Sequence, residues 1–304
     1  MPTPTSLEGT LGRLDRIIED ACTEGSHLGV FPAMYRSVTA AVLEAIRSGG
    51  FFDDDEVVEH LTVVFADLYF EAYDRYRGND EAASCWVVAF ETAESPQPRM
   101  ILQHLLLGMN AHINLDLGLA THQVAGDDLT LVKADFVRVN EILFQILDRL
   151  QGGLGEVSPR MALVDRLGGQ WDERMMRVGL STCRDLAWTF ANILAITDDI
   201  PGATARRDAD ASWVARAMLR PWSPVNLVGR MVANVESRDI RRIVASLERS
   251  RVDFEAASRA ADVSVGDLAA LDRGREPSLY QAAHSRRVRR RPTPMPRSRR
   301  GAGR

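Results

Sequence analysis

The residues with the clearest capacity for chemistry lie in the stretch GMNAHINLDLG, at positions 108–118. An imidazole, a carboxylate and two amides occur there among leucines, and they belong to His112, Asp116, Asn110 and Asn114. His112 and Asp116 are four residues apart, so on an α-helix both side chains point to the same face. An imidazole beside a carboxylate can act as a general base with an orienting partner, or the two groups can bind one metal ion.

A second histidine and an acidic residue extend this cluster to a predicted set of metal ligands. His104 lies eight residues before His112, which is about 80° around an α-helix, so both rings can reach one broad face. Glu71 supplies a carboxylate from a predicted helix at about 56–76, and Glu91 is the alternative. We therefore predict one divalent metal such as zinc, bound by His104, His112, Asp116 and Glu71.

The segment CRDLAWTFAN, at 183–192, adds a cation and an aromatic ring. Arg184 and Trp188 are four residues apart, so the guanidinium can lie over the indole or reach a core carboxylate. We predict that Arg184 binds Asp116, Glu71 or an anionic group of a substrate. Trp188 is expected to line the pocket, together with Asn110 and Asn114.

The same residues also have a purely structural interpretation. A buried His–Asp pair with two Asn side chains can form a hydrogen-bonded layer across a helix bundle, because buried polar groups need partners and such networks fix helix register. A stripe of polar residues on the predicted helix at about 56–76 is open to the same question, since it either faces the site or is the solvent face. Its members are His60, Asp67, Glu71 and Asp74.

The elements that must position these residues are all expected to be helices. Apolar residues recur at three- and four-residue intervals along most of the chain, which is typical of one helix face. Helices at about 56–76, 99–119 and 171–196 are predicted to build a central polar pocket. The sequence shows no strand–turn–helix alternation, so the predicted fold class is all-α, a single multi-helix bundle.

We predict three parts along the chain: a helical bundle domain at 1–250, a helical extension at 251–284 and a disordered Arg/Pro-rich tail at 285–304. The tail carries nine arginines and no acidic residue, whereas the whole chain has a net charge of −5, so the rest is acidic. Basic residues confined to a segment that cannot build a core do not make a folded nucleic-acid-binding surface. Any contact with nucleic acid is expected to be weak and to involve the tail.

The cysteine pattern and the hydropathy of the chain indicate the cellular compartment of the protein. Cys22, Cys85 and Cys183 are scattered and odd in number, which favours reduced thiols and a cytoplasmic location over a disulfide framework. No apolar run reaches the roughly 18–20 residues that a membrane-spanning helix needs. The first residues lack the pattern of a secretory signal. Nothing in the sequence indicates the oligomeric state.

The spacing from His112 to His122 resembles a ligand segment of the zinc-dependent phospholipase C and single-strand nuclease family. That segment reads His-x3-Asp-x5-His, and the family is also all-α. The resemblance implies zinc ligands at His112, Asp116 and His122, with the aspartate bridging metals. The chain has no histidine between His122 and His284, so the family's downstream ligands lack counterparts and a trinuclear site is not expected.

Several short segments together resemble a bacterial domain family of unknown function that is widespread in actinobacteria. They are FPAMYRSVT at 31–39, GGFFDDD at 49–55, FADLYFEAY at 65–73, WVVAF at 86–90, QHLLLGMNAHINLDL at 103–117 and RDLAW at 184–188. The GMNAHIN-x-D element is the most specific of them, and the resemblance covers about residues 30–200. It implies a helical single domain and no particular activity.

Three classes of function remain open from the sequence. The leading hypothesis is a metal-dependent or acid–base enzyme of hydrolase type, acting on a small, partly apolar substrate through His112, Asp116 and Arg184. The second is a non-catalytic small-molecule or lipid-binding bundle, or a cyclase-type biosynthetic enzyme, in which these residues form the polar floor of an apolar pocket. The third is an interaction protein that works through its acidic body and basic tail.

Overall fold

The computed structural model describes residues 4–158, 173–220, 230 and 232–248. Every regular element in these ranges is a helix, so the predicted all-α class is confirmed. The predicted extension at 251–284 and the predicted tail at 285–304 lie outside the described residues.

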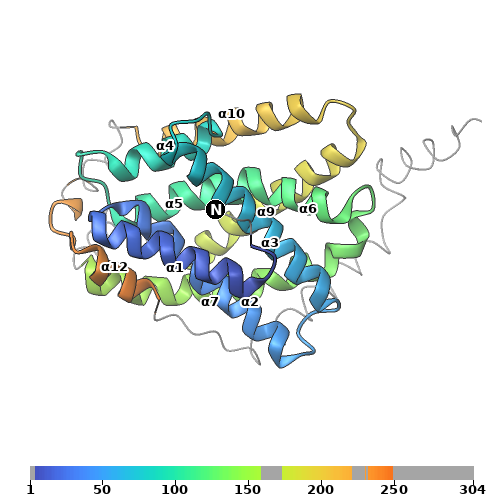
Figure 1. The fold of residues 1–304 in the computed structure, drawn as a ribbon, viewed down its shortest axis with the longest axis horizontal. Coiled ribbons are helices and arrows are strands. Elements are labelled where there is room, and N and C mark those ends of the chain that lie inside the picture. The colour runs from blue at the N-terminus through green and yellow to red at the C-terminus, as the bar shows by residue number, and fades with distance from the viewer. Residues whose placement is uncertain (1–3, 159–172, 221–229, 231, 249–304) are drawn as a thin grey trace, which may run out of the picture. The chain divides into compact units, whose positions relative to one another are not determined.

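The helices follow one another in the order labelled in Figure 1. They are α1 (Leu7–Glu24), α2 (Val30–Ser48), α3 (Asp55–Arg77), α4 (Ser84–Glu94), α5 (Ile101–Ala111), α6 (Leu117–Ala125), α7 (Lys133–Val157), α9 (Glu173–Ile196), α10 (Ile200–Met218) and α12 (Ile240–Leu247). Two 3-10 turns, η1 (His27–Gly29) and η3 (Leu129–Val132), precede α2 and α7, and a π-helical turn, η2 (His112–Asp116), joins α5 to α6.

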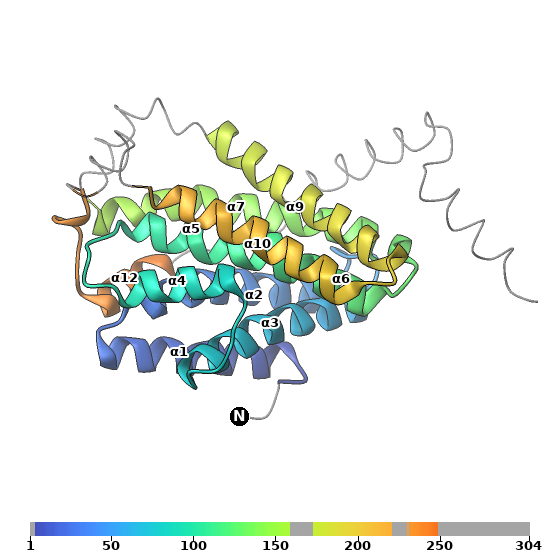
Figure 2. The same ribbon diagram turned by 90° about the horizontal axis from the view of Figure 1, so that it is seen from above.

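Together, α5, η2 and α6 form a nearly continuous helix along the middle of the bundle (Figure 2). They contact α2 and α3, and also α4, α9 and α10. The predicted helix at 99–119 is therefore right in type, but it does not end near residue 119, because α6 continues to Ala125 and is capped by Gly126. Gly118 instead allows α9 to pack closely against this helix. A Cβ at position 118 would lie 2.5 Å from the Phe190 ring and 2.9 Å from the carbonyl oxygen of Ala187, both on α9.

Carboxylates from distant parts of the chain complete the starts of two helices. Neither α4 nor α5 has a side-chain cap from its own N-cap residue. Asp208 of α10 accepts hydrogen bonds from the backbone N–H groups of Ser84 (2.8 Å) and Cys85 (2.9 Å). Glu236 accepts one from the N–H of Ile101 (2.8 Å). These bonds satisfy donors that the first turn of any helix leaves unpaired.

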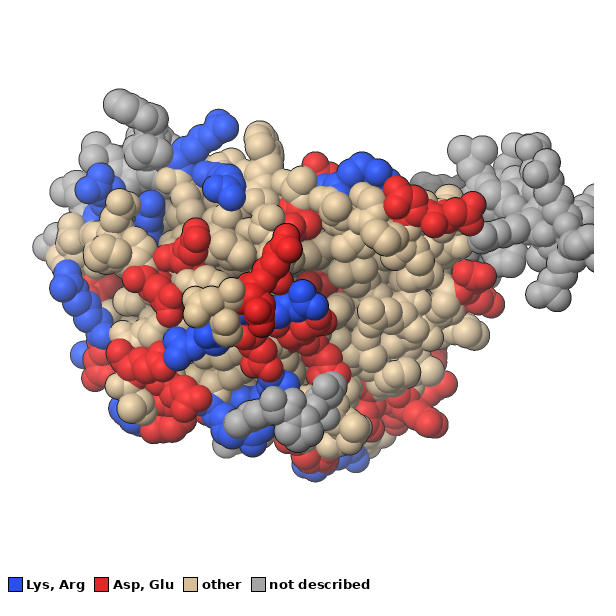
Figure 3. All heavy atoms as spheres, turned by 45° about the horizontal axis from the view of Figure 1, so that its top comes forward, with Lys and Arg blue, Asp and Glu red and all other residues tan. Residues whose placement is uncertain are grey.

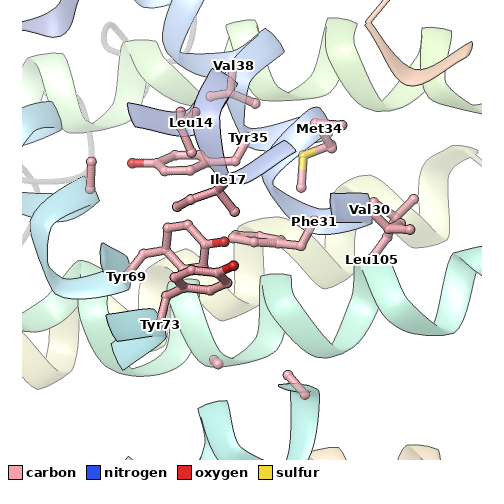
Figure 4. Packing of buried hydrophobic residues seen from close by; sticks show 14 of the residues in the cluster. Leu14, Ile17, Val30, Phe31, Met34, Tyr35, Val38, Tyr69, Tyr73 and Leu105 are labelled. Carbon is pink, nitrogen blue, oxygen red and sulfur yellow. The ribbon is translucent and has the colours of Figure 1, made fainter. Parts of the chain in front are cut away.

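The core between α1, α2, α3 and α5 is built largely from aromatic and branched side chains. Figure 4 shows Phe31 and Tyr35 of α2 together with Tyr69 and Tyr73 of α3 in this core. The ring centroids of Phe31 and Tyr69 are 5.3 Å apart, at an angle that places edge against face. Gly108 lets α5 approach this cluster, because a Cβ at that position would lie 2.4 Å from the Phe31 ring.

Charged side chains lie mostly at the surface, and in Figure 3 acidic and basic residues are interspersed on the face shown. The polar stripe of α3 behaves in this way: His60, Glu71 and Asp74 are exposed, and Asp67 is half-buried. Glu71 pairs with Arg75 at 2.6 Å. The solvent-face interpretation of this stripe is therefore the one that agrees with the structure. Within the part of the chain that the structure describes, no helix is long and apolar enough to cross a membrane.

Candidate functional site

The predicted histidine–aspartate pair lies in a local irregularity of the central helix. Residues His112–Asp116 form a π-helical turn, in which the N–H of Leu117 bonds to the carbonyl oxygen of His112, five residues back. The wider turn still leaves His112 Nδ1 2.9 Å from Asp116 Oδ2. The i, i+4 pairing that the sequence predicts is thus present, whereas the π-helical geometry has no signal in the sequence. Such turns occur frequently at functional sites.

A third residue, Trp86 of α4, completes this pair. The indole Nε1–H donates a hydrogen bond to Asp116 Oδ2 at 2.9 Å. An indole has no acceptor, so the direction of this bond is fixed. His112, Asp116 and Trp86, called the His112 network below, are 3%, 3% and 1% exposed. The network therefore lies in the core and is shielded from bulk water.

Aromatic rings enclose the imidazole of this network. Phe65 stacks on His112 with ring centroids 3.5 Å apart and planes 6° apart, and Tyr35 packs edge-on at 4.5 Å. Among the described residues, His112 Nε2 has no hydrogen-bond partner. Burial lowers the pKa of His112 well below its ordinary value. Burial also raises the pKa of Asp116 far above its ordinary value, although the hydrogen bond from Trp86 opposes this. Both shifts favour an uncharged pair.

The two asparagines connect the central helix to α10, and neither lines either of the two pockets described below. Asn110 Nδ2 donates to the carbonyl oxygen of Ala211 (2.9 Å), and Asn114 Nδ2 donates to Asn110 Oδ1 (3.0 Å). Arg207 of α10 donates to the carbonyl oxygen of Asn114 through Nε and to its Oδ1 through Nη2 (3.2 Å). Sequence reasoning missed Arg207, which lies 93 positions from Asn114 in the chain.

Arg184 is buried, as expected for a core residue, but its partner differs from the predicted carboxylate. Its Nη2 donates to the carbonyl oxygen of Phe136 at 2.6 Å, and the guanidinium lies 4.3 Å over the Phe136 ring. Trp188 packs against that same ring at 5.1 Å. Burial lowers the pKa of Arg184 to about 9. Arg184 and Trp188 thus form a separate cluster around Phe136, and neither joins Asp116 or Glu71.

The four predicted metal ligands are not brought together. Glu71 is exposed and paired with Arg75, and the alternative ligand Glu91 is also exposed. His104 stacks on His27 with ring centroids 4.7 Å apart and does not contact His112. In the described ranges, no three His, Cys, Asp or Glu residues are grouped closely enough to hold a metal ion.

A cavity of about 250 Å³, called the outer pocket, opens beside His104 at the end of the bundle where α1 ends and α5 begins. The segments that form it are the α1–α2 connection, the α4–α5 loop and the chain before α12. Its lining residues are Gly25, His27, Ser95, Pro96, Gln97, Pro98, Arg99, His104, Ala233, Glu236, Ser237 and Arg238. Of these, the sequence predicted only His104 as a site residue, because the others lie in connections far apart in the chain.

A smaller inner pocket of about 20 Å³ continues from the same two histidines into the core. Its lining residues are His27, Leu28, Phe31, Tyr69, Trp86, Ala89, Phe90, Ala93, His104 and Gly108. The volume suits about one water-sized group. Two lining residues, Trp86 and Phe31, also contact His112. The inner pocket therefore extends from the outer pocket to the aromatic shell of the His112 network.

Burial lowers the pKa of both histidines that lie between the two pockets. His104 is 7% exposed, its Nδ1 has no hydrogen-bond partner among the described residues, and burial lowers its pKa to about 3. The pKa of His27 is lowered too, first by burial and then by the charge of Arg238. At neutral pH both rings are uncharged, so each offers one nitrogen as donor and one as acceptor.

These features define a class of protein: an all-α bundle with a sealed polar network in its core and a separate polar cavity at one end. Residues 7–221 match the model of a family of unknown function, DUF5995, and the protein belongs to this family. The chain matches no curated protein and no solved structure. The expectation of a family without a known activity is thereby confirmed. The resemblance to the phospholipase C segment remains a prediction.

Proposed function

We propose that this protein is a small-molecule-binding helical bundle, and that its ligand occupies the outer pocket against His27 and His104. The observation that carries the proposal is the environment of His104. This ring is almost fully buried and forms a wall of both pockets, yet its Nδ1 has no partner among the described residues. A buried polar atom without a partner costs about 1–3 kcal/mol. A ligand that hydrogen-bonds to this nitrogen would remove the cost.

The dimensions of the site agree with a small ligand. The outer pocket has a volume of about 250 Å³, near the lower end of the roughly 300–1,000 Å³ that ligand pockets occupy. The inner pocket adds room for one further small group among Phe31, Tyr69 and Trp86. The proposed ligand is therefore compact, with its polar part in the outer pocket.

Amide chemical-shift mapping by NMR tests this proposal with three probes: benzyl alcohol, benzoate and phenyl phosphate. We expect at least one probe to shift the amides of Gly25, His27 and His104 at millimolar concentration. The variant Gln97→Trp places a large ring at an exposed position of the pocket lining, and it should weaken that probe tenfold or more. Glu91→Trp is the matched control, since Glu91 is exposed on α4 but does not line either pocket. The absence of any shift, or equal binding by both variants, would overturn the proposal.

A second candidate is acid–base catalysis by the His112 network, with His112 as base and Asp116 as its orienting partner. Two observations favour it: the π-helical turn and the partnerless Nε2 of His112 among the described residues. Hydrolysis of p-nitrophenyl acetate tests this candidate. His112→Gln should abolish turnover, while His122→Gln should retain it. Equal rates in both variants would eliminate the candidate.

A further inference from the structure

The outer pocket is lined by an excess of cationic and hydrogen-bond-donating side chains. Arg99 and Arg238 are part of its wall, next to the imidazoles of His27 and His104. Glu236 is the one carboxylate among the lining residues that the structure describes. The charges of the lining are therefore not balanced by the lining itself.

The carboxylate of Glu236 is already occupied by other groups. One oxygen accepts the N–H of Ile101 at 2.8 Å, and the other accepts the hydroxyl of Ser158. Burial raises the pKa of Glu236, and these two hydrogen bonds oppose the shift. Glu236 thus acts as a cap for α5, and it forms no ion pair with either arginine among the described residues.

The two arginines have no acidic partner in the described residues. Within the described ranges, Arg99 has a single long contact, to Gln97 Oε1 at 3.5 Å, and Arg238 forms no ion pair. By contrast, Arg241, three residues after Arg238, pairs with Glu19 at 2.8 Å. The pKa of Arg99 is lowered first by burial and then by the charge of Arg230, which indicates surplus positive charge in this region.

We infer that the ligand of the outer pocket is a small organic anion, whose carboxylate or phosphate group is bound by Arg99 and Arg238 and whose uncharged end points toward the inner pocket. This inference rests on the proposed binding function and specifies its ligand class. Arginine binds planar carboxylates and phosphates through paired N–H donors, so both groups share the chemistry that the site offers. The imidazoles of His27 and His104 add neutral donors or acceptors beside the anion.

The decisive comparison is between benzoate and benzyl alcohol, which are similar in size and differ in charge. We expect benzoate to bind the full-length protein at least tenfold more tightly, as measured by NMR titration. The double variant Arg99→Gln/Arg238→Gln should reduce this preference to about one. Arg241→Gln is the matched control and should retain the full preference. Circular dichroism verifies that each variant keeps its helical content.

The outcomes separate the two proposals. Equal affinity for the two probes in the wild type, or a preference that survives in the double variant, overturns the anion inference and leaves the binding function intact. If no probe binds, the binding function fails and the inference fails with it. A titration with phenyl phosphate then distinguishes the two kinds of anionic group. Tighter binding of phenyl phosphate than of benzoate identifies a phosphate ligand, and the reverse order identifies a carboxylate.

Discussion

The His112 network and the stacked pair of His27 and His104 both hold imidazole rings away from bulk water, but their surroundings differ. In the network, Asp116 Oδ2 bonds to the imidazole of His112 and accepts the indole N–H of Trp86, and Phe65 covers the face of the imidazole. The Nε2 of His112 has no partner among the described residues, but it faces this aromatic shell and not the outer pocket. The stacked pair lies between two pockets, and the Nδ1 of His104 has no partner in the described part of the chain. From this comparison we infer that buried polar groups that hydrogen-bond to one another stabilise the fold. Buried polar groups that lie beside a cavity without a protein partner are available to a ligand. Four predictions test it.

Asp116→Ala should have the largest effect on stability. It leaves the indole N–H of Trp86 without its acceptor and the imidazole of His112 without its hydrogen-bond partner, so the free energy of unfolding should fall by about 3 kcal/mol. Urea denaturation measures the change. Asp116→Asn keeps an acceptor for Trp86 and should cost about 1 kcal/mol. Equal losses in the two variants would mean that the hydrogen bonds of the network do not stabilise the fold.

Gly108→Ala tests the wall that the two regions share. The new Cβ would lie 2.4 Å from Phe31, which contacts His112 and also lines the inner pocket. Overpacking of this kind should lower the free energy of unfolding by about 2 kcal/mol. Gly12→Ala is the control, because nothing lies within 4 Å of its Cβ. This helical glycine should instead gain about 0.5–1 kcal/mol. A neutral Gly108→Ala would show that Phe31 can move freely.

The pH dependence of stability should distinguish His104 from an exposed histidine. Burial lowers its pKa to about 3, whereas an unfolded histidine has a pKa of about 6.5. Between these values the unfolded chain binds the extra proton, so the contribution of His104 is complete above pH 6.5 and is lost as the pH falls. Relative to His104→Gln, the wild type should lose about 1.4 kcal/mol between pH 7.5 and pH 5.5. Parallel unfolding curves for the two proteins would mean that water reaches the ring.

Arg238→Ala should have the smallest effect on the fold. Arg238 is exposed, so its removal should change the free energy of unfolding by less than about 0.5 kcal/mol. Thermal denaturation without added anions measures this. A loss comparable to that of Asp116→Ala would show that the outer pocket is part of the stabilising core, and the contrast between the two regions would disappear.

The sequence predicts the features that depend on local periodicity. It predicts the helices and the all-α class, because buried residues recur on one helix face. It also predicts the pairing of His112 with Asp116, because four positions bring both side chains to the same face. The predicted central pocket between helices 56–76, 99–119 and 171–196 agrees with the structure only in part. Tyr69, His104 and Gly108 of the first two helices line the inner pocket, whereas no described residue of 171–196 lines either pocket.

The remaining site features depend on tertiary contacts that leave no local pattern. Trp86 lies 30 positions before Asp116, and its bond requires α4 to pack on the central helix. Arg184 bonds to a backbone carbonyl oxygen, an acceptor that every residue carries and that no sequence pattern identifies. The outer pocket combines loop residues such as His27, Arg99 and Arg238, which become neighbours only after the helices have assembled.

The carboxylates that cap the first turns of α4 and α5 determine where the chain can be shortened without loss of these contacts. Asp208 and Glu236 lie 124 and 135 positions after the backbone groups that they bind. On a ribosome, the first turns of α4 and α5 emerge long before the residues that complete them. A protein shortened at residue 221, where the family match ends, would lack Glu236 and one wall of the outer pocket. The smallest fragment suitable for expression or crystallisation should therefore extend through α12.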